Sequence, residues 1–184
     1  MTSDESSQLC LRGSLILADP SLQDSNFHRT VLLLTEHRHD SGAHGYVLNR
    51  PFSKTAGELL TAPEFKPLAK VPVYIGGPVS TEQLTFVAFK WDPGSGGLTW
   101  ATHLTREDAK HRLENGETVR AFVGYSGWAG GQLESELKRR SWITRKPDRS
   151  IISGNSDSLW SDLLSSMGPW FHLLSRMPDD PGLN

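Results

Sequence analysis

Cysteine is almost absent from this 184-residue sequence, in which Cys10 is the only one. An intramolecular disulfide is therefore excluded, which is typical of proteins from reducing compartments. Because Cys10 lies between Leu9 and Leu11, we expect an unreactive, partly buried thiol. A regulatory thiol is the alternative interpretation.

An excess of charge of one sign is also lacking, as are long apolar runs. Lys and Arg total 19 against 21 Asp and Glu, for a net charge of −2. Specific DNA binding is not expected, because DNA-binding proteins usually carry an excess of basic residues. A local basic patch would still be compatible with this net charge. No apolar run approaches the ~20 residues that span a bilayer, and residues 1–8 lack the basic start and apolar segment of a signal peptide. We therefore expect a cytoplasmic protein with no membrane partner.

The composition that is present is typical of a globular protein, with 36% hydrophobic and 22% charged residues. One domain is the default for this length, and no repeat or linker divides the chain. We predict a single domain over residues 9–177, with flexible tails at 1–8 and 178–184.

Short apolar runs bounded by turn residues predict strands, and apolar positions three or four apart predict helices. The expected strands cover residues 12–18, 30–35, 42–49, 71–75, 84–91, 98–103 and 118–125. The expected helices cover residues 55–60, 105–115, 130–140 and 156–167, with a packed segment at 170–174. Pro51 should end the third strand, and Ala109 and Leu113 should face the core. Since strands come in groups and helices enter late, we expect an α+β fold with a mixed or antiparallel sheet.

The segment from Gly124 to Trp128 resembles the nucleophile elbow of hydrolases, which needs glycine two residues before and two after the serine. Here Gly127 directly follows Ser126, so the spacing is wrong. The other interpretation is a tight turn into the following helix. We predict that Ser126 is not a nucleophile, and we assign no catalytic residue.

Three histidines, His37, His39 and His44, lie within eight positions, and His37 and His39 alternate so that both can point to one face of a strand. Their spacing matches no zinc signature, and no cysteine accompanies them. We interpret them as half-exposed loop histidines, and we predict no metal and no cofactor.

Two other features have both structural and functional interpretations. Gly76 and Gly77 are most simply a turn, although their amides would suit an anion. Trp128 lies between glycines on a turn, where an aromatic side chain can line a pocket. Charged residues four apart, Glu134 with Lys138 and Glu136 with Arg140, are typical of a solvated helix face.

Several ordered motifs stand out when they are taken together. They are residues 18–24 followed by Phe27, Glu36 with His37, residues 42–51, residues 76–79, residues 124–128, residues 131–134 and residues 136–137, with Trp142 soon after. In this order they resemble the YqgE/AlgH family of bacterial proteins. Asp19 and Ser126 depart from the family pattern, which has methionine and alanine there. The resemblance implies a bifurcated sheet, part of it closed as a small barrel, and a bacterial cytosolic protein. It implies no activity, although members are often labelled as transcriptional regulators.

We expect a non-enzymatic regulatory module that binds an unknown small ligand or protein partner in a polar pocket. Its residues are predicted to be Asp24, His37, Asn49, Arg50, Gly76, Gly77, Trp128, Gln132 and Glu134. Arg50 is the expected anion contact, since its guanidinium matches a carboxylate or phosphate; the structural alternative is a pair with Asp24, with Asn49 capping a turn. A small acid–base enzyme using His37 with Asp24 or Glu134 is the second hypothesis, and direct DNA binding is the third.

Overall fold

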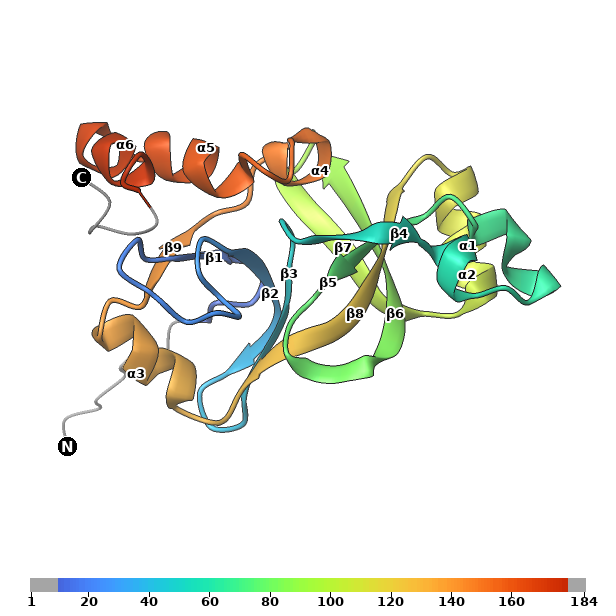
Figure 1. Cartoon of the computed structure of the whole chain (residues 1–184), viewed down its shortest axis with the longest axis horizontal. Coiled ribbons are helices and arrows are strands. Elements are labelled where there is room, and N and C mark those ends of the chain that lie inside the picture. The colour runs from blue at the N-terminus through green and yellow to red at the C-terminus, as the bar shows by residue number, and fades with distance from the viewer. Residues whose placement is uncertain (1–9, 179–184) are drawn as a thin grey trace.

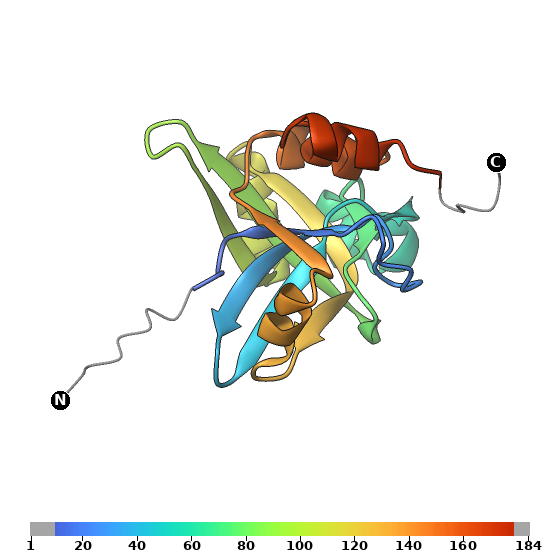
Figure 2. The same cartoon turned by 90° about the vertical axis from the view of Figure 1, so that its left-hand side faces the viewer.

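The computed structural model describes residues 10–178, and one long strand, β8 (Thr118–Trp128), divides its sheet into two branches. The first part of β8 pairs with β5 and β6, whereas its last three residues pair with β3. One branch continues from β8 through β3, β2, β1 and β9, and the other contains β4, β5, β6 and β7. Among the described strand pairs, β5 with β8 is parallel and the others are antiparallel. The predicted α+β fold is confirmed: a mixed, largely antiparallel, bifurcated sheet curls into a partly closed barrel flanked by helices (Figures 1 and 2).

The remaining strands and the helices have the following bounds. The strands are β1 (Leu15–Ala18), β2 (Val31–Arg38), β3 (Gly42–Val47), β4 (Pro51–Thr55), β5 (Pro72–Ile75), β6 (Val79–Asp92), β7 (Gly97–Leu104) and β9 (Trp142–Arg145). The helices are α1 (Ala56–Leu59), the 3-10 helix η1 (Pro63–Leu68), α2 (Arg106–Glu114), α3 (Gln132–Lys138), α4 (Ser150–Ser153), α5 (Leu159–Ser165) and α6 (Pro169–Ser175). All predicted strands and helices are present, whereas β4, η1, β9 and α4 were not predicted and α6 was expected only as a packed segment.

The strands β1 and β2 are buried on both faces, which explains their continuous apolar sequences. Leu15, Leu17 and Leu33 face a core that α4, α5 and α6 cover. Ile16 and Leu32 face a second core, which α3 closes from the opposite side (Figure 1). A third core lies under α1, η1 and α2, at the other end of the molecule.

Two of the elements that the sequence did not predict are edge strands. Pro51 was expected to end β3, and it does lie beyond the end of that strand, but it also begins β4. β4 pairs with β5 alone, in an irregular register, so the missing amide of proline is tolerated there. β9 has four residues and pairs with β1 alone.

Three expectations about burial are wrong. Cys10 is exposed, because the neighbouring Leu11 is the residue that packs in the core. Ala109 of α2 is buried, but Leu113, one turn later, is 40% exposed, because the contact of α2 with the core ends before its last turn. In α6, Leu174 packs against the core while Trp170 is 66% exposed, because the helix presents a second apolar face to solvent. The predicted tails lie outside the described residues, except for Pro178.

A buried arginine connects the C-terminal helices to the sheet. The Arg120 guanidinium donates to the carbonyl oxygens of Ile151 (2.9 Å) and Ile152 (3.4 Å) and lies over the rings of Tyr74 and Phe89. Burial lowers the pKa of Arg120, partly offset by Tyr74. Within residues 10–178, no helix has the length and apolarity that crossing a bilayer requires.

Candidate functional site

The side chains of Asn49 and Arg50 form hydrogen bonds to the backbone of the loop of residues 19–30. The Asn49 side chain accepts from the Val31 amide and donates to the Arg29 carbonyl, both at 2.9 Å. The Arg50 guanidinium donates to the carbonyl oxygens of Ser25 and His28 at 3.3 Å. Burial lowers the pKa of Arg50, and the negative charge of Asp24 partly offsets this effect. The polar groups of both residues are therefore engaged with backbone groups that hold the loop in place.

Gly76 and Gly77 pack directly against β8. The Gly76 amide donates to the Val123 carbonyl at 2.9 Å, and its own carbonyl accepts from the Val47 amide and from the Ser126 hydroxyl. A Cβ atom on Gly77 would lie only 2.3 Å from Ser126 Oγ. Ser126 is fully buried, so its hydroxyl acts as a structural donor. The two glycines thus permit a close approach of backbones, and the Gly76 amide is used within the sheet.

The turn after β8 and the helix α3 carry a network centred on Glu136. Its Oε2 accepts from the indole nitrogens of Trp128 (2.9 Å) and Trp142 (2.8 Å), and its Oε1 accepts from Gln132 Nε2 (3.0 Å). Gln132 in turn accepts from the Ala129 amide at 3.0 Å. The indole rings lie 6.0 Å apart, edge to face, and both are buried. The donors to this carboxylate are all neutral, so its negative charge is not compensated within the network.

These groups line a cleft of about 340 Å³ between α3 and the loop of residues 19–30, which we call the α3 cleft. Phe27 comes from the loop, stacks at 6.3 Å on Trp128 and packs edge-on at 5.4 Å against Trp142. Asp24 stands on the loop side, where its carboxylate accepts from the Asn26 amide at 2.8 Å. The full lining is Leu22, Asp24, Phe27, Gly127, Trp128, Gln132, Glu136, Arg139, Ser141 and Trp142.

Of the nine residues predicted for the site, the structure brings Asp24, Trp128 and Gln132 into this cleft. Asn49 and Arg50 lie behind the loop, and Gly76 and Gly77 lie against β8, outside the lining. The sequence interpretation missed the role of Glu136, because its four-residue spacing to Arg140 suggested a surface pair. The signal that was available is the presence of two tryptophans, Trp128 and Trp142, whose indoles need an acceptor when buried.

His37 and Glu134 meet on the other side of α3. His37 Nε2 lies 2.9 Å from Glu134 Oε1, and its Nδ1 accepts from the Leu11 amide at 3.1 Å. This second bond requires a bare Nδ1, so the ring donates through Nε2 and both of its nitrogens are engaged. His39 Nδ1 also lies 3.2 Å from the same carboxylate oxygen. The geometry is that of a clamp between β2 and α3.

The Glu134 carboxylate carries the clearest electrostatic signature of this clamp. Burial by itself raises the pKa of Glu134, but its own backbone amide, His39 and His37 donate hydrogen bonds that outweigh burial and lower the pKa overall. The third histidine, His44, is elsewhere: its ring stacks at 4.5 Å on Tyr125, and burial lowers its pKa. Among the described residues, no three His, Cys, Asp or Glu side chains are arranged to hold a metal ion.

Comparison with known proteins agrees with the motifs. The profile of a family described as AlgH-like matches residues 15–172. A UPF0301 protein of Chlorobium luteolum is 34% identical, with 94% of each chain covered, and one of Parabacteroides distasonis is 33% identical, covering 96% of this chain and 92% of that one.

Solved structures give the same result. The solution structure of the AlgH protein from Pseudomonas aeruginosa aligns with a TM-score of 0.66 at 27% identity, over 97% of this chain and 98% of that one. A crystal structure of a Corynebacterium diphtheriae protein, at 22% identity and a TM-score of 0.70 over 91% and 92% of the two chains, shares the fold. The chain therefore belongs to the AlgH-like family, as its sequence motifs predicted.

Proposed function

We propose that this protein is a non-catalytic binding module whose α3 cleft holds a cationic group joined to an apolar one. Such a group is an amine of a small ligand or a Lys or Arg side chain of a partner protein. The observation that carries the proposal is the lining of the cleft, in which three aromatic rings and two carboxylates occur together. Aromatic faces and carboxylates together favour cations.

The charges of the lining support a cation rather than an anion. It contains two carboxylates, Asp24 and Glu136, and one guanidinium, Arg139. Neither carboxylate forms an ion pair within 4 Å among the described residues. Arg50, the expected anion contact, is occupied by backbone carbonyls behind the loop. A cation therefore improves the electrostatic balance of the cleft, whereas an anion worsens it.

The bonding of the polar groups supports binding over catalysis. His37, the base of the enzyme hypothesis, is engaged at both ring nitrogens, and Ser126 is buried with its hydroxyl bound to a carbonyl. A general base needs a free lone pair within reach of its substrate. The rigid network around Glu136 instead suits a preorganised binding surface.

The test is a pair of matched probes, benzamidine and benzoate, titrated separately into 15N-labelled protein. We expect benzamidine to bind weakly, with a dissociation constant of about 1 mM, and to shift the indole N–H signals of Trp128 and Trp142. Benzoate should leave them in place. Asp24→Asn keeps the acceptor for the Asn26 amide but removes the charge, so it should weaken the binding of benzamidine. Asp157 is an exposed carboxylate outside the cleft, and Asp157→Asn should leave the binding unchanged. Equal shifts with both probes, or none with either, contradict the proposal.

A further inference from the structure

The face of α6 that points away from the core is apolar and exposed. Trp170 is 66% exposed, Leu173 64% and Met177 46%, which makes them three of the five large exposed hydrophobic residues among those described. Trp170 and Leu173 are three residues apart on α6, a spacing that places side chains on one helix face, and Met177 lies two residues beyond the end of the helix. We call these three residues the α6 face. Soluble proteins rarely leave such a contiguous patch uncovered.

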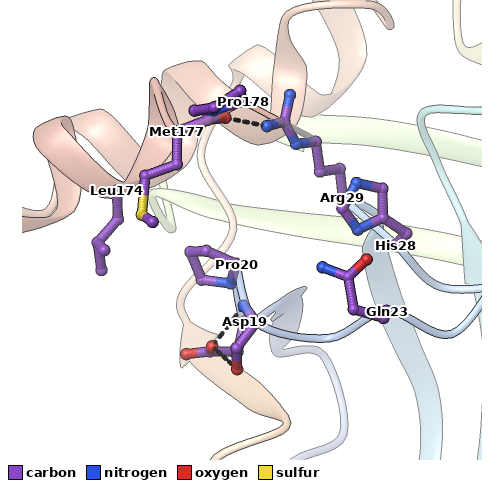
Figure 3. A pocket seen from close by; sticks show the side chains of 9 residues that line it. Asp19, Pro20, Gln23, His28, Arg29, Leu174, Met177 and Pro178 are labelled. Atoms are coloured by element: carbon purple, nitrogen blue, oxygen red, sulfur yellow. Dashed lines mark hydrogen bonds between the residues drawn. The ribbon is translucent and has the colours of Figure 1, made fainter. Parts of the chain in front are cut away.

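A cavity of about 380 Å³ opens beside this face, between α6 and the loop of residues 19–29 (Figure 3). Leu174, Met177 and Pro178 form one wall, and Pro20 and Gln23 stand opposite. Its volume falls in the range of pockets that hold small ligands, roughly 300–1,000 Å³, so an indole fits inside. Met177 thus belongs both to the α6 face and to the cavity, whereas Leu174 joins the cavity to the core.

The walls of the cavity are held in place without an occupant. Arg29 donates to the Met177 carbonyl oxygen and lies 5.2 Å over the ring of Trp160. Trp160 in turn donates to the Ala18 carbonyl at 2.9 Å. The loop and the end of α6 are therefore tied together through the core, so the cavity is preformed.

From this arrangement we infer that two copies of the chain associate through α6, each inserting Trp170 into the cavity of the other. Trp170 stands near the start of α6, and Met177, in the cavity wall, lies two residues beyond its end; the seven positions from one to the other correspond to about 10 Å at the helical rise. A two-fold axis between antiparallel α6 helices then places each Trp170 opposite the partner's Met177. Such a self-complementary patch is what an isologous dimer requires.

The charge of the contact and the surface area that it buries determine the expected affinity of the dimer. Residues 169–177 contain one charged side chain, Arg176, which lies beyond the end of α6, so the α6 helices themselves meet without repulsion between like charges. Each copy buries on the order of 400–500 Å², since an aromatic side chain contributes ~150–250 Å² and a standard interface needs ~800 Å² a side. The dimer is therefore weak, with a dissociation constant on the order of 10–100 µM.

Sedimentation velocity of the full chain between about 5 µM and 1 mM tests this inference. We expect a concentration-dependent monomer–dimer equilibrium that Trp170→Glu weakens at least ~10-fold. Leu113→Glu replaces an exposed apolar residue on α2 and is the matched control, which should dimerise like the parent. Because both positions are exposed, both variants should keep the parent's circular dichroism and melting temperature.

A second variant separates insertion from simple helix pairing. Gln23→Trp fills the cavity from its own loop and leaves Trp170 intact, so it should also weaken the dimer. If Gln23→Trp dimerises like the parent, reciprocal insertion is wrong. A chain that stays monomeric at every concentration overturns the inference as well. So does a chain that dimerises only after residues 179–184 are deleted, because that segment is then the occupant.

Discussion

At the scale of single residues, Glu136 is the acceptor for two buried indoles. Glu136→Ala leaves the nitrogens of Trp128 and Trp142 without a partner. An unsatisfied buried donor costs about 1–3 kcal/mol, so we expect a loss of about 2–4 kcal/mol in the free energy of unfolding. Glu136→Gln keeps an acceptor oxygen and should cost about 1 kcal/mol. Urea denaturation measures both, and equal losses in the two variants would show that the bonds to the indoles are unimportant.

The Glu134 clamp predicts a dependence of stability on pH. The pKa of Glu134 is lowered in the folded protein from its model-compound value of 4.5. Its ionised form is therefore favoured by folding, and the stabilisation is present above about pH 4.5 and is lost as the pH falls through the folded pKa. Glu134→Gln removes this contribution. We expect the parent to be more stable than Glu134→Gln at pH 7, with the difference shrinking towards pH 3.

Thermal melts of both proteins across this pH range test the sign. Glu58→Gln is a suitable control, because that carboxyl is exposed and its lowered pKa comes from its own helix cap on α1. Any effect of Glu58→Gln on stability should therefore be independent of His37 and His39. A difference between parent and Glu134→Gln that grows on acidification would mean that the clamp does not favour the carboxylate.

At the scale of elements, the contact of the β5–β6 connection with β8 depends on Gly77. Its φ is +156°, and a Cβ atom would lie 2.3 Å from both the Tyr125 carbonyl oxygen and Ser126 Oγ. We expect Gly77→Ala to lower the free energy of unfolding by about 3 kcal/mol or more. The added Cβ atom could be accommodated only if the β5–β6 connection or β8 moved, and either movement would break hydrogen bonds of the sheet. Gly96→Ala is the matched control in the β6–β7 turn, where φ is +62° and no atom lies within 4 Å.

Gly96→Ala should lower the free energy of unfolding by only about 1–2 kcal/mol, because backbone strain is its only cost. Guanidinium titrations of the two variants give the comparison. Similar losses would mean that backbone conformation, rather than the close approach of β8, is what requires glycine at position 77.

At the scale of the whole molecule, the net charge of −2 argues against sequence-specific DNA binding at physiological salt. We expect titrations with duplexes of varied sequence to show no preference approaching the ~10³-fold that specific proteins typically achieve. Varying the salt concentration supplies the control, since phosphate contacts produce a steep loss of affinity. A preference of that size with a steep salt slope would restore the regulator label in its DNA-binding sense.

Much of the fold was predictable from the sequence. The apolar runs of β1 and β2 predicted buried strands, and these strands do have cores on both faces. A helix was expected over residues 55–60, and α1 does lie there, where Glu58 accepts from the Thr55 amide at 2.7 Å. The edge strand β9 was not predictable, because four residues without clear alternation carry little signal and β9 exists only by pairing with β1.

The candidate site was less predictable than the fold. Asp24, Trp128 and Gln132 were expected as site residues and do line the α3 cleft. Arg50 was expected in the same pocket, but its guanidinium donates to the backbone carbonyls of Ser25 and His28, which lie 25 and 22 positions earlier in the chain. A long side chain on a turn has the same sequence signature whether it meets a ligand or the chain itself.

The sequence by itself determined the family, the buried strands, the positions of four helices and the modest net charge, because these depend on local patterns and composition. Only the tertiary structure decided which polar residues remain available to a ligand. Glu136 and Glu134 both belong to α3, yet one meets two indoles and the other meets His37 and His39. Partners 6, 8, 95 and 97 positions apart are brought together by packing across the sheet, and no local pattern encodes such distances.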